Sequence, residues 1–366
     1  MSKKILFKNF DWVLFAVVGL LISFGLLTIY STAFAETDAK GNKAISQAVF
    51  AALGFILVFV FAKIDYRVFR KFTGLFYVIM IALLLVVEFA GSNVLGATRW
   101  INLGFFQLQP SEVAKIISII ILAKYFSDHN EEMWRVKHII ISGIYIIIPV
   151  LMVAKQPDLG TAIVIFSIWL GMLFVSNVKR STLIKMAGIG LAILPLMWFT
   201  LHDYQKNRIL TLFSPDADVL GKGWNVEQAN IAIGSGQFFG RGFGYGSQSH
   251  LNFLPMQHTD FAFAVLAEEM GFLGSVILIG LYFLLLYRVL AIAKSSRDSF
   301  GMFIATGTAV MFFVHIFVNI GMNIRLMPAT GIPLPFISAG GTAILINLAA
   351  IGILESIYSR HKKIDF

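Results

Sequence analysis

The sequence predicts an all-α integral membrane protein with about ten transmembrane helices and one large extracytoplasmic loop. Hydrophobic residues make up 58% of the 366-residue chain and charged residues only 13%, a balance typical of membrane proteins. Apolar stretches of roughly 20 residues, long enough to cross a bilayer, recur along the chain. No internal repeat or low-complexity linker separates a second domain, so residues 1–366 are expected to form one polytopic unit.

Ten apolar stretches are predicted to span the membrane. They cover residues 12–34, 45–62, 72–90, 111–126, 138–154, 159–177, 182–201, 261–290, 300–322 and 336–358. The first is too long for the core of a signal peptide, so it is expected to be retained as a helix. The fourth is short and opens with Glu112 and Lys115.

The distribution of Lys and Arg predicts the orientation of these spans. Most of the 29 basic residues fall on the side that carries the amino terminus, as the positive-inside rule requires of cytoplasmic segments. Both termini are then cytoplasmic, and the large loop at 202–260, between the seventh and eighth spans, is extracytoplasmic. A bacterial cytoplasmic membrane fits this pattern.

Composition also excludes several functions. The chain has no cysteine, which rules out disulfides, thiolate nucleophiles and cysteine-bound metals. Its net charge is +9, but no basic stripe with interleaved aromatic residues occurs, so a nucleic-acid partner is not expected. The segment GSGQFFGRG is rich in glycine, yet it follows no strand of a βαβ unit and does not predict a nucleotide site.

Four polar clusters lie at the predicted outer ends of the spans. The first contains Arg99 and continues through Gln109-Pro110-Ser111 to Glu112 and Lys115. A proline at a helix start and an acid–base pair three residues apart also describe a capped helix with a local ion pair. For Arg99, Glu112 and Lys115, substrate binding and this purely structural role both stay open.

The second cluster, Lys155-Gln156-Pro157-Asp158, joins two spans through a very short turn. Asp158 suits the N-cap position of the following helix, although it is also a candidate ligand. Lys155 lies beside a helix N-terminus that attracts anions, so it is predicted to bind a phosphate group. The alternative is that Lys155 only anchors the chain at the membrane surface.

The third cluster is the glycine-rich stretch 221–274, which is too polar and too irregular to lie in hydrocarbon. It is expected to lie outside the bilayer or to line a cavity. A short helix is predicted at 225–233, with Asn225 placed to cap it. Candidate substrate-binding residues in this stretch are Gln228, Ser235, Arg241, His258, Thr259 and Glu268.

Asp260 lies where this stretch enters the next apolar helix. A helix N-cap is its ordinary structural interpretation, but a cap does not explain the polar neighbours before it and the acids two turns later. The small residues Ala264, Ala267, Gly271 and Gly274 are predicted to share one helix face below Asp260. Asp260 is therefore the candidate catalytic group.

The fourth cluster contains Arg325 and a loop rich in proline and glycine that reaches Ser338. Both are candidate substrate-binding residues. Before the loop, His315, Asn319 and Asn323 recur every four residues and form a polar stripe on the ninth span. A buried, hydrogen-bonded stripe is the more ordinary interpretation of this pattern, and a proton relay is the alternative.

Together these clusters resemble the signature segments of the SEDS family of shape, elongation, division and sporulation proteins. The segments are QPSEVAK, KQPDLGTA, IAIGSGQFFGRGFGYGSQ, LPMQHTDFAFAVLAEEMG and PATGIPLPFISAGG. The likeness covers nearly the whole chain and is closer to the elongation branch, RodA, than to the division branch, FtsW. This chain departs from the family pattern at Gln237, Met256, Arg325 and Ala339.

The resemblance implies a peptidoglycan glycosyltransferase that polymerises lipid II and extends a nascent glycan strand. It also implies a class B penicillin-binding protein as the transpeptidase partner. The essential acid of the family's HTDF segment corresponds to Asp260 here. No cofactor is implied with certainty, although a divalent cation, Mg²⁺ or Mn²⁺, is compatible with a pyrophosphate substrate.

A mechanism follows from these residues. Asp260 is expected to remove the proton of the acceptor hydroxyl, since partial desolvation raises the pKa of a carboxyl toward working pH. Lys155, with Arg99, Arg241 or Arg325 as weaker candidates, is expected to neutralise the departing pyrophosphate. The hypothesis requires Asp260 and Lys155 to share a cavity.

Three other functions remain open at this stage. A flippase or transporter for lipid-linked sugars also predicts many spans with intramembrane polar residues, but it predicts polar clusters reachable from both faces. A membrane scaffold leaves Asp260 and Lys155 replaceable. The third is a cell-division polymerase of the same family.

Overall fold

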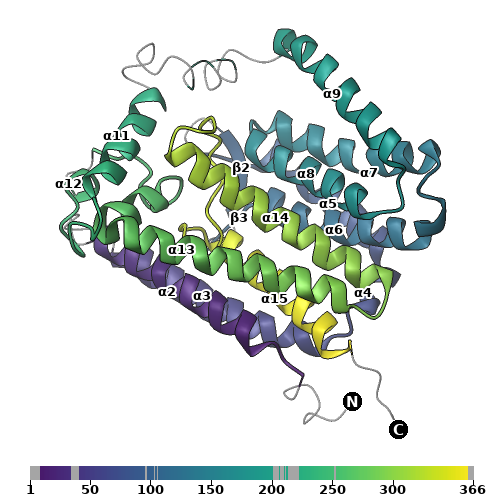
Figure 1. Ribbon diagram of the computed structural model, residues 1–366, viewed down its shortest axis with the longest axis horizontal. Coiled ribbons are helices and arrows are strands. Elements are labelled where there is room, and N and C mark those ends of the chain that lie inside the picture. Colours follow the sequence, from purple (N-terminus) through teal and green to yellow (C-terminus); the bar gives the residue numbers. More distant parts are fainter. Residues whose placement is uncertain are drawn as a thin grey trace.

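The computed structural model describes residues 9–33, 41–94, 97–102, 104, 106–200, 206, 210, 212, 222–250 and 253–361. Helices dominate it (Figure 1). They are α2 (Trp12–Ala33), α3 (Gly41–Lys63), α4 (Arg67–Lys71), α5 (Thr73–Ala90), α6 (Pro110–Asp128), α7 (Val136–Lys155), α8 (Leu159–Val175), α9 (Arg180–Thr200), α11 (Lys222–Ser235), α12 (Ser247–His250), α13 (Ala262–Ser295), α14 (Ser299–Asn323) and α15 (Gly341–Ser359).

Each of the ten predicted stretches overlaps one of these helices. Six of them, α2, α3, α7, α13, α14 and α15, are long and apolar enough to cross a membrane, and α5 and α8 contain shorter apolar helices. The chain is therefore a mostly helical, multi-pass membrane protein. The full count of ten crossings stays a prediction. Much of the predicted outer loop at 202–260 lies outside the described residues.

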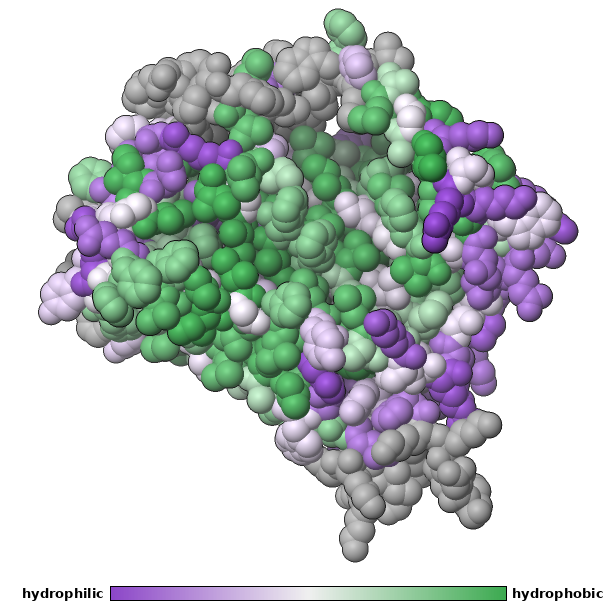
Figure 2. Space-filling model, in the orientation of Figure 1, coloured by the Kyte–Doolittle hydropathy of each residue, from purple (hydrophilic) through white to green (hydrophobic). Residues whose placement is uncertain are grey.

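Helix α14 occupies the centre of the bundle. It packs against α6, α8 and α13, while α15 packs against α3 and α7 against α8. Helix α9 extends away from the other helices at the top of Figure 1. Hydrophobic residues cover the middle of the face shown in Figure 2, and hydrophilic residues gather toward its right-hand end and again at its upper left. This distribution is the one that a bilayer requires of a protein surface.

A small antiparallel sheet corrects the expectation of an all-α fold. Strands β1 (Ser92–Val94), β2 (Ala97–Asn102) and β3 (Gln107–Leu108) pair in the order β1-β2-β3. Val94 pairs with Ala97, and Ile101 pairs with Leu108. The segment TRWIN is rich in β-branched and aromatic residues, which favour a strand once it lies outside the apolar helices. The first polar cluster therefore begins on this sheet, which carries Arg99, and continues into the start of α6.

The glycine-rich stretch packs against a kink in α13. Gly271 has non-helical φ and ψ values of 64° and −161°, so the helix is broken there and the predicted small-residue face does not continue past it. The break leaves backbone N–H and carbonyl groups of α13 without partners inside the helix, and the loop before α12 forms hydrogen bonds with them. Arg241 N donates to the Glu268 carbonyl at 3.0 Å, and Phe272 N donates to the Gln237 carbonyl at 2.8 Å. These bonds satisfy backbone groups that would otherwise be left without partners in hydrocarbon.

At the opposite end of the molecule, Tyr66 links three helices. Its hydroxyl donates to Asp298 at 2.9 Å, and its backbone N–H donates to the Ser356 hydroxyl at 3.1 Å. Burial raises the pKa of Tyr66 to about 12, so the phenol stays protonated and remains a donor. Asp298 in turn caps the N-terminus of α14 through Gly301 N.

Candidate active site

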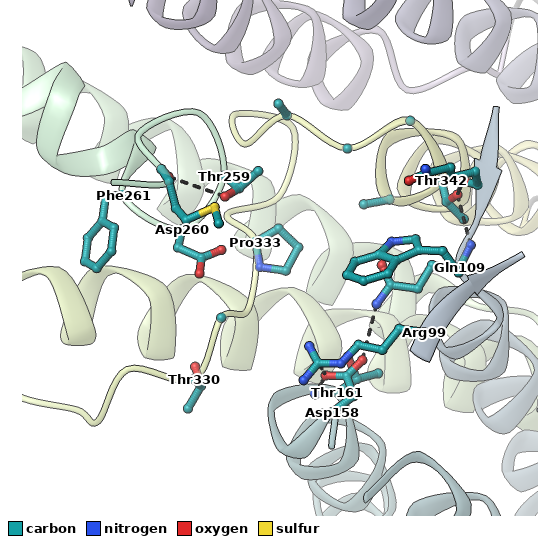
Figure 3. A pocket seen from close by; sticks show the side chains of 18 of the residues that line it. Arg99, Gln109, Asp158, Thr161, Thr259, Asp260, Phe261, Thr330, Pro333 and Thr342 are labelled. Carbon is teal, nitrogen blue, oxygen red and sulfur yellow. Dashed lines mark hydrogen bonds and ion pairs between the residues drawn. The ribbon is translucent and has the colours of Figure 1, made fainter. Parts of the chain in front are cut away.

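A cavity of about 660 Å³ opens between the sheet, the start of α8, the turn before α13 and the loop between α14 and α15. Residues of all four polar clusters line it: Arg99, Trp100, Gln107, Gln109, Asp158, Thr161, Thr259, Asp260, Thr330, Pro333 and Thr342. Figure 3 shows Asp260, Thr259 and Thr330 on one side and Arg99, Asp158 and Gln109 on the other. The fold therefore gathers segments that are more than 200 residues apart in the chain into one pocket.

Asp260 does not cap α13. The N-cap residue is Phe261, whose side chain makes no capping hydrogen bond. The interpretation of Asp260 as a cap is therefore wrong, because the turn places the carboxylate toward the cavity instead (Figure 3). Gly331 lies beside it, since a β-carbon added to Gly331 would be 3.5 Å from Asp260 Oδ2. The carboxylate thus faces the polar space that the loop encloses.

The residues before Asp260 hold the turn in place. The His258 carbonyl accepts a bond of 2.7 Å from Ala339 N, and the Thr259 carbonyl accepts one from the Ser338 hydroxyl. His258 itself turns away from the cavity, and its Nδ1 lies 2.9 Å from the hydroxyl of Thr32 on α2. Of these candidates only Thr259 lines the cavity, whereas His258 and Ser338 support its wall.

Arg99 and Asp158 form the opposite wall. Arg99 Nε donates to the Gln156 carbonyl at 3.1 Å, and another guanidinium nitrogen donates to the Pro157 carbonyl. Asp158 caps α8 through Thr161 N, as predicted, and also accepts bonds from Gln109 Nε2 and Ser111 Oγ at 3.2 and 3.1 Å. The guanidinium is fixed against the α7–α8 turn and is only 18% exposed.

Lys155 does not share the cavity with Asp260. Its side chain is 72% exposed and pairs with Glu88 on α5, and it is absent from the cavity lining. The expectation that these two residues share a cavity is therefore wrong. Lys155 is the last residue of α7, and its side chain extends toward Glu88 on α5. Arg99, which the sequence ranked lower, takes the position expected of Lys155.

Glu112 and Lys115 form the predicted ion pair, buried inside the helix bundle. Lys115 Nζ donates to Glu112 Oε1 at 2.9 Å and lies 2.8 Å from His315 Nε2. Because lysine has no acceptor, His315 Nε2 must accept this bond and Nδ1 must donate to the Pro333 carbonyl, which is 3.0 Å away. The pair does not line the cavity. It contacts the cavity only indirectly, because His315 connects Lys115 to Pro333, which does line it.

The remaining sequence candidates also lie outside the cavity lining. Glu268 is fully buried and accepts hydrogen bonds from Gln248 N at 2.8 Å and Ser249 N at 3.1 Å, at the start of α12. Arg241 Nε donates to the Ser235 carbonyl at 3.3 Å. Gln228 is buried within α11. Ser235 Oγ donates to the Ala232 carbonyl at 2.8 Å. These four side chains shape the outer segment and do not line the cavity with Asp260.

The structure of α11 shows that Asn225 is not a helix cap and that Arg325 forms an ion pair with this helix. It begins at Lys222, one turn earlier than expected, so Asn225 lies inside the helix and does not cap it. Asn225 lines the cavity instead. Glu227 on the same helix pairs with Arg325 at the end of α14. Arg325 thus joins α11 to the fourth cluster and does not line the cavity.

Three departures from the family pattern fall at unusual backbone positions. Gln237, Met256 and Arg325 have φ values of 51°, 53° and 60°. This left-handed region favours glycine. All three residues nevertheless carry side chains, and that of Arg325 makes an ion pair with Glu227.

Several cavity residues were not predicted as ligands. They are Trp100, Gln109, Thr161, Thr330 and Thr342. Thr342 links the sheet to α15, because its hydroxyl donates to the Gln107 carbonyl at 2.7 Å and accepts from Gln109 N at 3.2 Å. All five lie within or next to the four polar clusters, so their position in these clusters was the sequence feature that could have identified them. Within the described part of the chain, no three His, Asp or Glu side chains come together as a metal site.

Comparison with known proteins places this architecture in a family. The family model of cell cycle proteins of the FtsW, RodA and SpoVE type matches residues 11–363. Peptidoglycan glycosyltransferase MrdB of Escherichia coli K12 is 38% identical over 360 residues, which cover 98% of this chain and 95% of MrdB.

Two solved structures have the same fold. A chain from a peptidoglycan synthase complex that coordinates polymerization and crosslinking superposes with a TM-score of 0.83 at 28% identity, covering 96% of this chain and 98% of that one. The rod shape determining protein RodA of Thermus thermophilus superposes with a TM-score of 0.72 at 27% identity, covering 97% and 98%. The chain therefore belongs to the FtsW, RodA and SpoVE family, the SEDS family that its motifs resemble.

Proposed function

We propose that this chain is a peptidoglycan glycosyltransferase that polymerises lipid II into glycan strands during cell elongation. The observation that carries the proposal is the cavity in which the Asp260 carboxylate and the Arg99 guanidinium occupy opposite walls. The similarity to MrdB, a protein named as a peptidoglycan glycosyltransferase, extends over nearly the full length of both chains and supports it.

Asp260 is the general base in this proposal. The acceptor hydroxyl attacks the sugar carbon that bears the pyrophosphate, and Asp260 takes the hydroxyl proton as the new glycosidic bond forms. The bond from that carbon to the pyrophosphate oxygen breaks, and polyprenyl pyrophosphate departs. A carboxylate in a partly enclosed polar cavity suits this proton transfer, which contributes about 10²–10⁴-fold to catalysis.

Arg99 stabilises the departing pyrophosphate. A guanidinium has five N–H donors. Two bonds go to the α7–α8 turn and Nη1 lies 4.0 Å from Asp158 Oδ1, which leaves the remaining donors available for phosphate oxygens. Because that turn holds the guanidinium in place, the charge is positioned before the reaction begins. The charge of Asp158 repels an anion nearby, but its carboxylate is paired with the Arg99 guanidinium and accepts hydrogen bonds from Gln109, Ser111 and Thr161 N. Lys155 has no role in this site.

The cavity lies on the extracytoplasmic side in this proposal, with both termini in the cytoplasm of a bacterium and ten spans in its cytoplasmic membrane. The basic residues of α4 and the start of α9, which the positive-inside rule assigns to the cytoplasm, support this orientation. A class B penicillin-binding protein supplies the transpeptidase. The similarity to a chain of a complex that couples polymerization to crosslinking supports this partnership.

Reconstitution with lipid II tests the function directly. The purified chain, in nanodiscs and together with its transpeptidase partner, is expected to convert lipid II into glycan polymer that a gel resolves. In a parallel assay with the chain in sealed vesicles, movement of lipid II across the vesicle membrane without polymer formation would instead indicate a transporter. A protein that neither polymerises lipid II nor moves it, while its partner still binds, would indicate a scaffold.

A further inference from the structure

The turn that carries Asp260 is weakly held by its own backbone. The N–H groups of Thr259, Asp260 and Phe261 all point to one carbonyl, that of Met256, at 3.1, 3.2 and 3.4 Å. A carbonyl has two lone pairs, so it cannot satisfy three donors well. Met256 also has a φ of 53°, a conformation that disfavours residues with a side chain. Contacts from other elements must therefore fix this turn.

Two asparagines on α14 supply such contacts. Asn319 Nδ2 and Asn323 Nδ2 donate to the Asp260 carbonyl at 3.1 and 3.2 Å. Both side chains are fully buried and lie one helical turn apart, so they reach the carbonyl from the same side. The polar stripe is thus hydrogen-bonded, and its two asparagines meet at the peptide of the proposed base.

Asn319 also joins the two segments that flank the carboxylate. Its Nδ2 donates to the Ile332 carbonyl at 2.8 Å as well as to Asp260. Ile332 follows Gly331, the residue beside Asp260 Oδ2. Loss of Asn319 would therefore disturb the loop and the turn together. Asn323 is the more selective probe, because its other bonds go to Asn319 on its own helix.

Asn323 also has a feature that opposes a purely stabilising role. Its amide oxygen is buried and has no hydrogen-bond partner among the described residues. A buried acceptor without a partner destabilises a folded protein. An apolar residue of the same size would remove this destabilisation along with the bond to Asp260. The amide at this position is therefore better explained by what its N–H groups do for Asp260.

We propose that Asn323 is a positioning residue for the polymerisation reaction. Together with Asn319 it fixes the Asp260 peptide, and so holds the carboxylate at the angle and depth that proton removal requires. The inference rests on the proposed role of Asp260 as the base. Displacement of a reacting group by about 1 Å is enough to lower a rate by about 10²-fold.

The test compares Asn323→Leu with Thr308→Val in the full-length chain, using lipid II polymerisation in nanodiscs with the partner present. Thr308 is a buried residue of the same helix whose hydroxyl donates to the Ile304 carbonyl at 2.9 Å, so its replacement also removes a buried hydrogen bond. For Asn323→Leu, kcat is expected to fall by at least about 10-fold while KM stays within about twofold. Its melting temperature is expected to equal or exceed that of the wild type. Thr308→Val is expected to leave kcat unchanged.

Further variants separate positioning from folding. Asn323→Gln keeps the amide donor and is expected to retain more activity than Asn323→Leu. Should the leucine variant fail to fold, Asn323→Val removes the same donor and is measured in the same way. A wild-type kcat for the apolar variant overturns the proposal. So does a loss of kcat that merely follows a lower melting temperature, or a change confined to KM.

The Asp260→Asn variant distinguishes this inference from the function on which it rests. If Asp260→Asn polymerises lipid II normally, the base assignment fails and the positioning role fails with it. If Asp260→Asn is inactive while Asn323→Leu has a normal kcat, only the positioning role is wrong.

Discussion

Gly271 and Gly240 pack backbone against backbone: a β-carbon added to Gly271 would lie 2.2 Å from Gly240 N. One added to Gly240 would lie 2.1 Å from the Glu269 carbonyl oxygen. Both residues also have positive φ values, 64° and 83°. Because the two backbones are this close, the glycine-rich loop can form hydrogen bonds with the backbone of α13 at its kink. The kink lies eleven residues after Asp260. The outer segment therefore depends on two residues without side chains.

Gly271→Ala is expected to destabilise the protein. The added methyl group must move backbone atoms of the loop, and alanine disfavours the combination of φ 64° and ψ −161° by about 1–3 kcal/mol before any clash is counted. Thermal unfolding in detergent measures the effect. Gly280→Ala, on the same helix with no atom within 4 Å of the added carbon, is the matched control. It is expected to be neutral or to stabilise the helix by up to about 1 kcal/mol. Equal melting temperatures for the two variants would contradict the packing described here.

Asp260→Asn is expected to lower kcat for lipid II polymerisation by at least about 10²-fold, because the amide cannot accept the hydroxyl proton. The variant should still fold and bind its partner, since the turn is held through main-chain atoms. Asp128→Asn, which removes only an exposed ion pair with Arg70, is the control and should keep full activity. Normal glycan extension by Asp260→Asn would refute the base assignment.

Arg99→Gln and Lys155→Gln are expected to differ. Loss of a charge-assisted bond to the pyrophosphate costs about 1.5–3 kcal/mol, or roughly 10–100-fold in kcat/KM for lipid II. Lys155 is exposed and makes only a surface ion pair, so its replacement should change kcat/KM by less than about fivefold. Steady-state kinetics over a range of lipid II concentrations measure both. A larger effect at Lys155 than at Arg99 would move the anion site to the outside of α7.

Lys115→Met is expected to destabilise the protein by about 3–5 kcal/mol, because it leaves the buried Glu112 carboxylate without its cation. The double variant Glu112→Gln with Lys115→Met removes both charges and should recover much of this loss. Chemical or thermal unfolding of the three proteins in one detergent gives the comparison. If the double variant is less stable than Lys115→Met alone, the two charges do not act as a pair.

The helices were predictable because hydrophobicity is a local property. Each predicted apolar stretch overlaps a helix, and the Glu112–Lys115 pair and the Asp158 cap follow from spacing within one element. The sheet was missed because its strands are short and its pairing depends on segments on either side of two turns. The kink at Gly271 was missed because the groups that stabilise it come from a loop some thirty residues earlier.

The sequence by itself determined that this is a helical membrane protein of the SEDS type, and it marked four polar clusters, Asp260 among them, as the candidate site. Hydropathy, charge bias and motif order depend only on the order of the residues in the chain, so the sequence is enough to show them. Only the tertiary structure decided which cation faces Asp260, because a side chain's direction depends on how its helix or strand packs. Lys155 ends α7 beside the α7–α8 turn, and Arg99 of β2 bonds to the same turn. The sheet nevertheless directs Arg99 into the cavity, whereas the Lys155 side chain is exposed and pairs with Glu88. The packing of α14 likewise brought Asn323 to the Asp260 carbonyl, a contact between residues 63 positions apart.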